Sequence, residues 1–195
     1  PADLPKFKMT FAKEGGVYLV NSDLSDEKYL YKGYDNLISP DGKKVVHTQS
    51  NQDGSRNIAL YDVESKSVKT LKSPTGKQSF DASFSPDSKK IAFCNFSGKK
   101  WNIAVVNIDD TGFFILSDKY KTDLFCPTFS PDGNSILCLD MQNFIELDLK
   151  GNILQTIPLK SITGDKQIYF SSANKGYFVN GKKEILFDAD TQDFF

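Results

Sequence analysis

The sequence is poor in the residues on which most enzyme and metal sites depend, with one histidine, one tryptophan and three cysteines among 195 residues. A Ser-His-Asp or Cys-His arrangement would have to use the single histidine, His47, and a histidine-rich metal site could hardly form. The cysteines are Cys94, Cys126 and Cys138; each lies in an apolar run, and their odd number and spacing fit neither a disulfide framework nor a zinc site. We therefore expect buried, reduced thiols, no catalytic residue, no metal and no cofactor.

Long apolar segments and an excess of one charge are missing too. No stretch approaches the roughly 18 apolar residues of a membrane-spanning helix, so no transmembrane segment is expected. The opening Pro-Ala-Asp-Leu-Pro lacks the basic and apolar regions of a signal peptide, which is therefore either absent or already removed. The 24 basic and 25 acidic residues nearly cancel, which gives no indication of a basic face for nucleic acid. We expect no nucleic-acid partner, and the oligomeric state stays open.

What the sequence does have is aromatic residues and an internal repeat. Its 16 phenylalanines and 8 tyrosines favour strands over helices. A motif of the type Phe-Ser-Pro-Asp-Gly-Lys-Lys, followed by apolar residues, begins at residues 38, 84 and 129, and a degenerate copy begins at residue 170. Proline at the second position and glycine at the fourth are typical of a β-turn, and the apolar residues on both sides predict a β-hairpin.

A second hairpin follows each motif at the same phase. Its first strands are predicted at residues 17–20, 58–62, 103–107, 144–148 and 185–188, and these starts are 41 to 45 residues apart. Two hairpins in each period make four strands, named A to D here, and four-stranded units at this period are the signature of propeller blades. The sequence thus predicts an all-β fold, a β-propeller of about five four-stranded antiparallel blades in one domain over residues 1–195. The predicted repeats are approximately 6–32, 36–72, 80–118, 125–160 and 166–195.

The ends of this arrangement are irregular. Before Val17 there is room for about one strand, so the first blade lacks a clear A strand, and the last blade ends barely into its D strand. Propellers usually protect their sheet edges by combining strands from both termini in one blade. Two alternatives stay open, a complete small ring with unusual closure and a fragment of a larger propeller.

The repeated Pro-Asp motif resembles that of TolB-like propellers, relatives of the WD-repeat proteins, over residues 38 to about 188. The resemblance implies a non-enzymatic module of the periplasm or cell envelope that recognises a protein or peptide. Similar propellers also occur as accessory domains of prolyl-oligopeptidase-type peptidases and as carbohydrate-active enzymes, which are the alternatives.

The expected binding residues lie in the loops that vary between repeats. The Ser-Pro-Asp turns join strands A and B on one face, so the B–C and D–A loops must share the other. Variable loops on a regular scaffold are where recognition residues concentrate. The predicted partner-binding residues are Arg56, Lys99, Lys100, Trp101, Tyr120 and Met141. A wedge between blades is the alternative for Trp101, and His47 is expected in the core or the channel wall.

Overall fold

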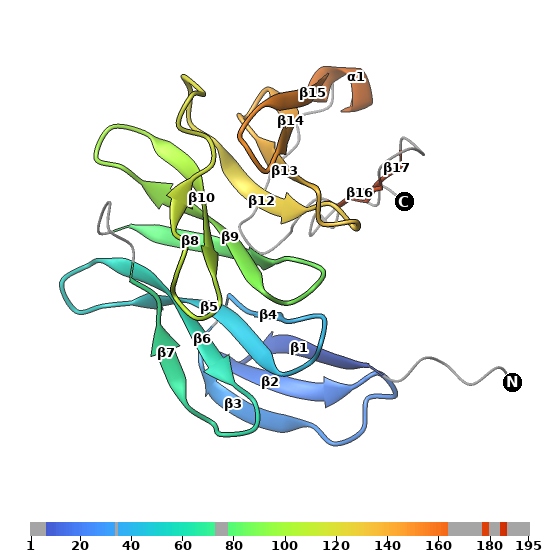
Figure 1. Cartoon of the computed structure of the whole chain (residues 1–195). Coiled ribbons are helices and arrows are strands. Elements are labelled where there is room, and N and C mark those ends of the chain that lie inside the picture. Colours follow the sequence, from blue (N-terminus) through green and yellow to red (C-terminus); the bar gives the residue numbers. More distant parts are fainter. Residues whose placement is uncertain (1–6, 34, 73–77, 164–176, 180–183, 187–195) are drawn as a thin grey trace, which may run out of the picture.

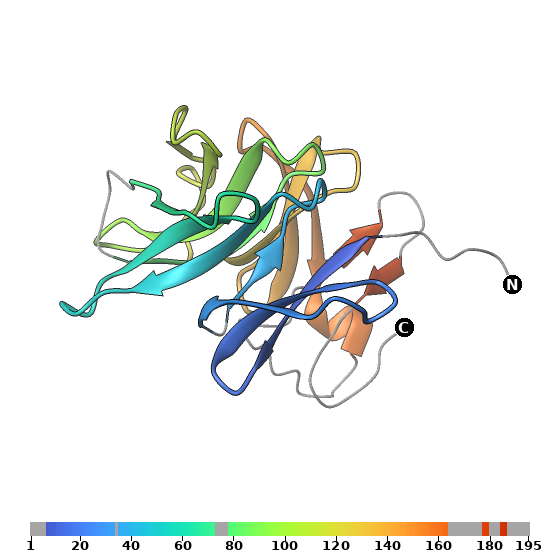
Figure 2. The same cartoon turned by 90° about the horizontal axis from the view of Figure 1, so that it is seen from below.

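The structure is a computed structural model that describes residues 7–33, 35–72, 78–163, 177–179 and 184–186. Its antiparallel sheets follow one another along the chain and are stacked like blades, from the first sheet at the bottom of Figure 1 to the fourth at the top. Figure 2, turned by 90°, shows the same succession of sheets from below. The prediction of an all-β fold with blade-like sheets is confirmed.

The strands of the described residues form five sheets. The first sheet holds β1 (Lys8–Lys13), β2 (Gly16–Asn21) and β3 (Lys28–Lys32). The second holds β4 (Leu37–Ile38), β5 (Lys44–Ser50), β6 (Arg56–Asp62) and β7 (Val68–Thr70). The third holds β8 (Ser79–Phe84), β9 (Lys90–Phe96), β10 (Trp101–Asn107) and β11 (Phe114–Ile115). The fourth holds β12 (Phe125–Phe129), β13 (Ser135–Leu139), β14 (Asn143–Asp148) and β15 (Ile153–Pro158), followed by α1 (Leu159–Thr163).

The ends of the chain differ from the regular blades. In the first sheet the described residues form three strands, with β1 in the B position, as the missing A strand led us to expect. The fifth sheet pairs β16 (Tyr177–Val179) with β17 (Glu184–Leu186). The rest of the repeat predicted over 166–195 lies outside the described residues. No helix within the described ranges has the length and apolarity needed to cross a bilayer.

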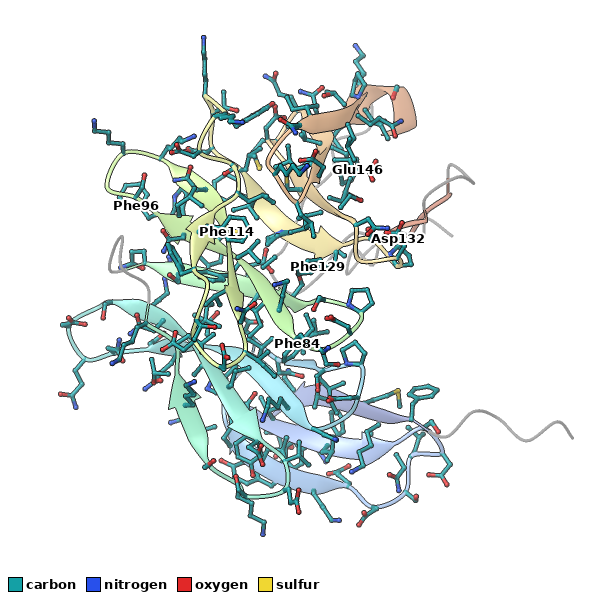
Figure 3. The ribbon with its side chains drawn as sticks, in the orientation of Figure 1. Phe84, Phe96, Phe114, Phe129, Asp132 and Glu146 are labelled. Atoms are coloured by element: carbon teal, nitrogen blue, oxygen red, sulfur yellow. The ribbon has the colours of Figure 1, made fainter. Side chains whose placement is uncertain are left out.

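The core lies between neighbouring sheets. In β9, Ile91 and Phe93 face the second sheet, whereas Ala92 and Cys94 face the fourth. Side chains alternate between the faces of a strand, so a strand covered on both faces is apolar throughout. Figure 3 shows Phe84 between the second and third sheets and Phe129 between the third and fourth.

The expectation of three buried thiols holds for Cys94 and Cys138, but Cys126 is only half-buried. Cys126 lies at a bulge in β12, where the register shifts between Phe125 and Thr128, and its φ is 53°. A bulge redirects a side chain from the regular alternation, which explains the exposure. Burial raises the pKa of the Cys138 thiol, so this cysteine is unreactive at neutral pH.

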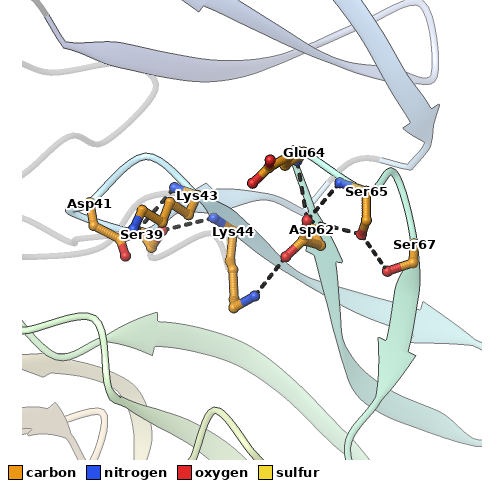
Figure 4. A network of polar contacts seen from close by, with 8 residues as sticks. All are labelled: Ser39, Asp41, Lys43, Lys44, Asp62, Glu64, Ser65 and Ser67. Atoms are coloured by element: carbon orange, nitrogen blue, oxygen red, sulfur yellow. Dashed lines mark hydrogen bonds and ion pairs between the residues drawn. The ribbon is translucent and has the colours of Figure 1, made fainter.

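The Ser-Pro-Asp motifs form three copies of one hydrogen-bonded turn. In the second copy Ser85 Oγ donates to Asp87 Oδ1 at 2.6 Å and accepts the Lys90 N–H at 2.9 Å, while the Lys89 N–H donates to Asp87 Oδ1 at 3.0 Å. The same bonds recur around Asp41, shown in Figure 4, and around Asp132. These bonds, first that from Ser85, hold the pKa of Asp87 below its usual value. The motif therefore has a structural role in each turn.

Candidate functional site

The B–C and D–A loops share one face and bond to each other. The Nε2 group of Gln78, which precedes β8, donates to the carbonyl of Gly54 in the β5–β6 turn at 3.0 Å. On the next sheets the Tyr120 hydroxyl, in the β11–β12 connection, donates to Asp140 Oδ2, next to the β13–β14 turn, at 3.0 Å. In Figure 1 the β5–β6 and β9–β10 turns lie at the left, and the Ser-Pro-Asp turns before β5, β9 and β13 lie at the right.

Two of the predicted residues, Arg56 and Trp101, meet over a third residue that the sequence did not single out. The guanidinium carbon of Arg56 lies 4.7 Å from the ring centre of Phe80 and 5.9 Å from that of Trp101. The Arg56 Nε donates to Gln78 Oε1 at 2.7 Å, which fixes the guanidinium over the rings. Each cation–π contact of this type contributes about 0.5–2 kcal/mol, depending on how dry the site is.

Trp101 is a half-buried wedge between sheets. Its ring meets Phe80 edge to face at 4.9 Å and packs at 5.1 Å from Phe96 and 6.2 Å from Phe125, the first residue of β12. Its backbone N–H donates to Asp123 Oδ1 at 2.8 Å, which ties the start of β10 to the D–A connection. The alternative expectation, a wedge between blades, therefore describes its packing, while its exposed part remains on the loop face.

Lys100 and Tyr120 are also brought together, but through the backbone. The Lys100 ammonium donates to the carbonyl oxygens of Ser117, Asp118 and Tyr120. This side chain thus holds the D–A connection that carries Tyr120. Burial and the hydrogen bond to Asp140 raise the pKa of the Tyr120 hydroxyl, which stays protonated as a donor.

Lys99 and Met141 lie at the rim. Lys99 is exposed in the β9–β10 turn, and Met141 is 61% exposed in the β13–β14 turn with φ 72°. An exposed methionine held by a left-handed turn residue presents a flexible apolar side chain to solvent, which suits a contact surface.

Beside Arg56 the loop face is hollowed by a cleft of about 450 Å³ between the first, second and third sheets. Its lining includes Lys32, Asp35, His47, Gln49, Arg56 and Phe80. The cleft offers charges of both signs, hydrogen-bonding groups and an aromatic surface. Only Arg56 among these residues was singled out as binding by the sequence. The others lie on β3, β5, β8 and the β3–β4 connection, and their neighbours in space depend on how the sheets pack.

His47 forms part of the wall of this cleft. Its ring packs at a tilt against that of Tyr31 of β3, with centres 4.4 Å apart, and burial lowers the pKa of His47 below 6.5 although Asp35 opposes the shift. Asp35 accepts a hydrogen bond from Thr48, and His47 Nδ1 has no hydrogen-bond partner among the described residues. The histidine and the carboxylate are thus not joined as a catalytic pair. Nor does the described part of the chain contain a cluster of three or more potential metal ligands.

No family model matches the sequence. Among solved structures, the chain is similar to TolB from Acinetobacter baumannii, with 16% identity, a TM-score of 0.68 and coverage of 96% of this chain and 48% of that one. A TolB structure from Agrobacterium tumefaciens is 21% identical, with a TM-score of 0.60, and the match covers 72% of this chain and 55% of that one. The tricorn protease is 15% identical, with a TM-score of 0.51, and the match covers 70% of this chain and 14% of the protease chain. This chain thus spans about half the length of the TolB structures, and it has the fold of a TolB-like β-propeller.

Proposed function

We propose that this chain is a non-enzymatic binding module that recognises a protein or peptide on the face of the B–C and D–A loops. The observation that carries the proposal is the Arg56 guanidinium, fixed over Phe80 and Trp101 at the edge of the 450 Å³ cleft. Arginine and aromatic residues that are already ordered before binding are typical of interface centres, because little side-chain entropy remains to be lost.

The cleft suits an extended peptide better than a small apolar ligand. Lys32 and Arg56 supply positive charge, Asp35 supplies negative charge, and Gln49 supplies both a donor and an acceptor for a peptide backbone. Phe80 gives the same cleft an apolar wall. A peptide with a carboxylate near Arg56 and an apolar side chain over Phe80 would match this lining.

The remaining predicted residues extend the surface across the third and fourth sheets. Lys99, Tyr120 and Met141 form its outer part, while Lys100 positions the connection that carries Tyr120. The partner is proposed to be a protein of the cell envelope, which rests on the TolB-like fold and on the resemblance of the repeated Pro-Asp motif to that of TolB-like propellers.

Hydrogen–deuterium exchange tests the face. With a partner isolated by pull-down, the amides of residues 51–56, 97–101, 118–123 and 140–142 are expected to become protected on binding. The Ser-Pro-Asp turns at residues 39–43, 85–89 and 130–134 serve as the internal control and should exchange as before. Protection confined to these turns would move the binding surface to the opposite face.

A second candidate function, an accessory propeller of a peptidase, is favoured by the match to the tricorn protease, of which only 14% is covered. The complete reading frame distinguishes the two candidates. A hydrolase domain in the same reading frame would favour the accessory role. A reading frame that adds further propeller blades or a TolB-like second domain, and no hydrolase domain, would favour the binding module.

A further inference from the structure

The face opposite the loops carries a second and larger cleft. It lies between the first and second sheets, has a volume of about 930 Å³ and is thus near the upper end of the usual range for ligand clefts, about 300–1,000 Å³. Its walls come from β1 and β3 on one side and from the Ser-Pro-Asp turn, β6 and the β6–β7 turn on the other. Nothing in the binding surface proposed above extends to this cleft.

The cleft exists because the first two sheets meet differently from the others. Continuous clusters of buried apolar side chains fill the spaces between the second and third sheets and between the third and fourth. Between the first and second sheets the closest ring contacts are those of Tyr31 with His47 and Tyr61, at 4.4 and 5.3 Å. Toward the Ser-Pro-Asp face this interface opens and becomes charged.

The charge of the cleft is predominantly positive. Among the described residues, five lysines and three carboxylates line it, which leaves a net charge of +2. Two of the carboxylates are already paired, Asp62 with Lys44 at 2.8 Å and Asp26 with Lys28 at 2.7 Å. Figure 4 shows the Asp62–Lys44 pair with Lys43 beside it. The remaining lysines, Lys8, Lys43 and Lys66, are exposed, and in the described part of the chain no carboxylate lies within 4.0 Å of their ammonium groups.

The floor of the cleft is apolar and aromatic. Leu19 and Tyr61 are buried beneath it, Leu30 and Val63 are half-buried, and Tyr29, a 58% exposed residue, also lines the cleft. Lysines on both walls above such a floor fit a chain that alternates negative and apolar side chains. A compact inorganic anion would leave the floor uncovered.

We propose that this cleft binds an acidic peptide segment whose apolar side chains cover Leu30 and Val63 and whose carboxylates pair with Lys43 and Lys66. The site is independent of the loop face around Arg56. The two faces together would let the module hold two different segments at once.

The probe for the test is a fluorescein-labelled nonapeptide in which glutamate alternates with leucine and phenylalanine, titrated with the protein at low salt and followed by fluorescence anisotropy. The double variant Lys43→Glu/Lys66→Glu is expected to weaken binding at least about 10-fold, since it replaces attraction with repulsion at two positions in the cleft. Lys43→Gln/Lys66→Gln should weaken it by about 3-fold and keeps the test valid if the reversal perturbs folding. Added salt should weaken binding to the wild type.

The matched control is Lys89→Glu/Lys150→Glu, which reverses exposed lysines in a Ser-Pro-Asp turn and a C–D turn outside the cleft. It should bind within about 2-fold of the wild type. Three results would each overturn the proposal. The control variant could lose as much affinity as Lys43→Glu/Lys66→Glu, a peptide with glutamine in place of glutamate could bind as tightly as the acidic peptide, or the wild type could fail to bind the acidic peptide. A loss confined to Arg56→Ala would also overturn it, by placing the acidic peptide on the loop face.

Discussion

The carbonyl oxygen of Leu116 lies where a side chain on Gly151 would begin: a β-carbon built on Gly151 comes within 2.2 Å of that oxygen. Leu116 follows the outer strand of the third sheet, and Gly151 lies in the C–D turn of the fourth, so the contact joins two blades. Gly151 also has φ 78°, a region in which other residues are strained. Glycine is therefore required at position 151 for two reasons: a β-carbon would collide with the Leu116 carbonyl, and the backbone has a positive φ.

Gly151→Ala is therefore expected to lower the free energy of unfolding by about 2–4 kcal/mol, the sum of left-handed strain and the displacement of the Leu116 carbonyl. Urea unfolding measures this loss. Gly98→Ala is the control, because Gly98 has φ 87° but no heavy atom within 4 Å of the added β-carbon. It should lose only about 1–2 kcal/mol. Equal losses would mean that the contact with Leu116 adds nothing.

Asp87→Ala tests the role assigned to the repeated motif. Loss of the bonds from Ser85 and the Lys89 N–H should lower the free energy of unfolding by about 0.5–1.5 kcal/mol. Partner affinity should not change, because this turn lies on the face opposite the loops. Lys89→Ala, which leaves both bonds in place, should be neutral in both measurements. Reduced affinity at an unchanged melting temperature would show that the motif binds the partner.

His47 predicts a specific pH dependence of stability. Burial, opposed in part by Asp35, holds its pKa below the ordinary 6.5, so the unfolded chain takes up the proton first as the pH falls. Stability is therefore expected to decrease below about pH 6.5, by at most about 1.4 kcal/mol per pH unit from this group.

His47→Phe should remove that decrease between pH 6.5 and 5, as measured by urea unfolding at several pH values. Phenylalanine suits this strand position, since Phe93 occupies the equivalent place in the third sheet and is buried there. The carboxylates contribute mainly at lower pH. An identical slope in wild type and variant would show that His47 does not remain neutral in the fold.

The parts of this fold that were predicted from sequence are those fixed by nearby residues. The bonds between Ser85 and Asp87 span two positions, so each motif specifies its turn wherever it occurs. The in-phase hairpins likewise specify which strands pair. The sharing of one face by the B–C and D–A loops followed from strand direction alone.

The parts that escaped prediction depend on packing between sheets. Phe80 belongs to the third sheet and Arg56 to the second, and no spacing in the sequence indicates that they meet. The ammonium of Lys100 bonds backbone carbonyls whose position depends on the path of the D–A connection. Pro127 in the bulge of β12 indicates an irregular strand, since proline occurs in strands mainly at edges and bulges. It does not indicate that the positive φ falls on Cys126, which is not a glycine.

The most direct test of the proposed binding face is the affinity of a partner, identified by pull-down, for four single variants: Arg56→Ala, Lys99→Ala, Trp101→Ala and Tyr120→Ala. Isothermal titration should show that at least one of them loses more than about 1 kcal/mol of binding free energy, about 5-fold in Kd, with unchanged circular dichroism. Lys43→Ala and Lys89→Ala, on the opposite face, should bind this partner like the wild type. Four neutral variants together with lost binding in Lys43→Ala or Lys89→Ala would contradict the account and place the partner on the other face.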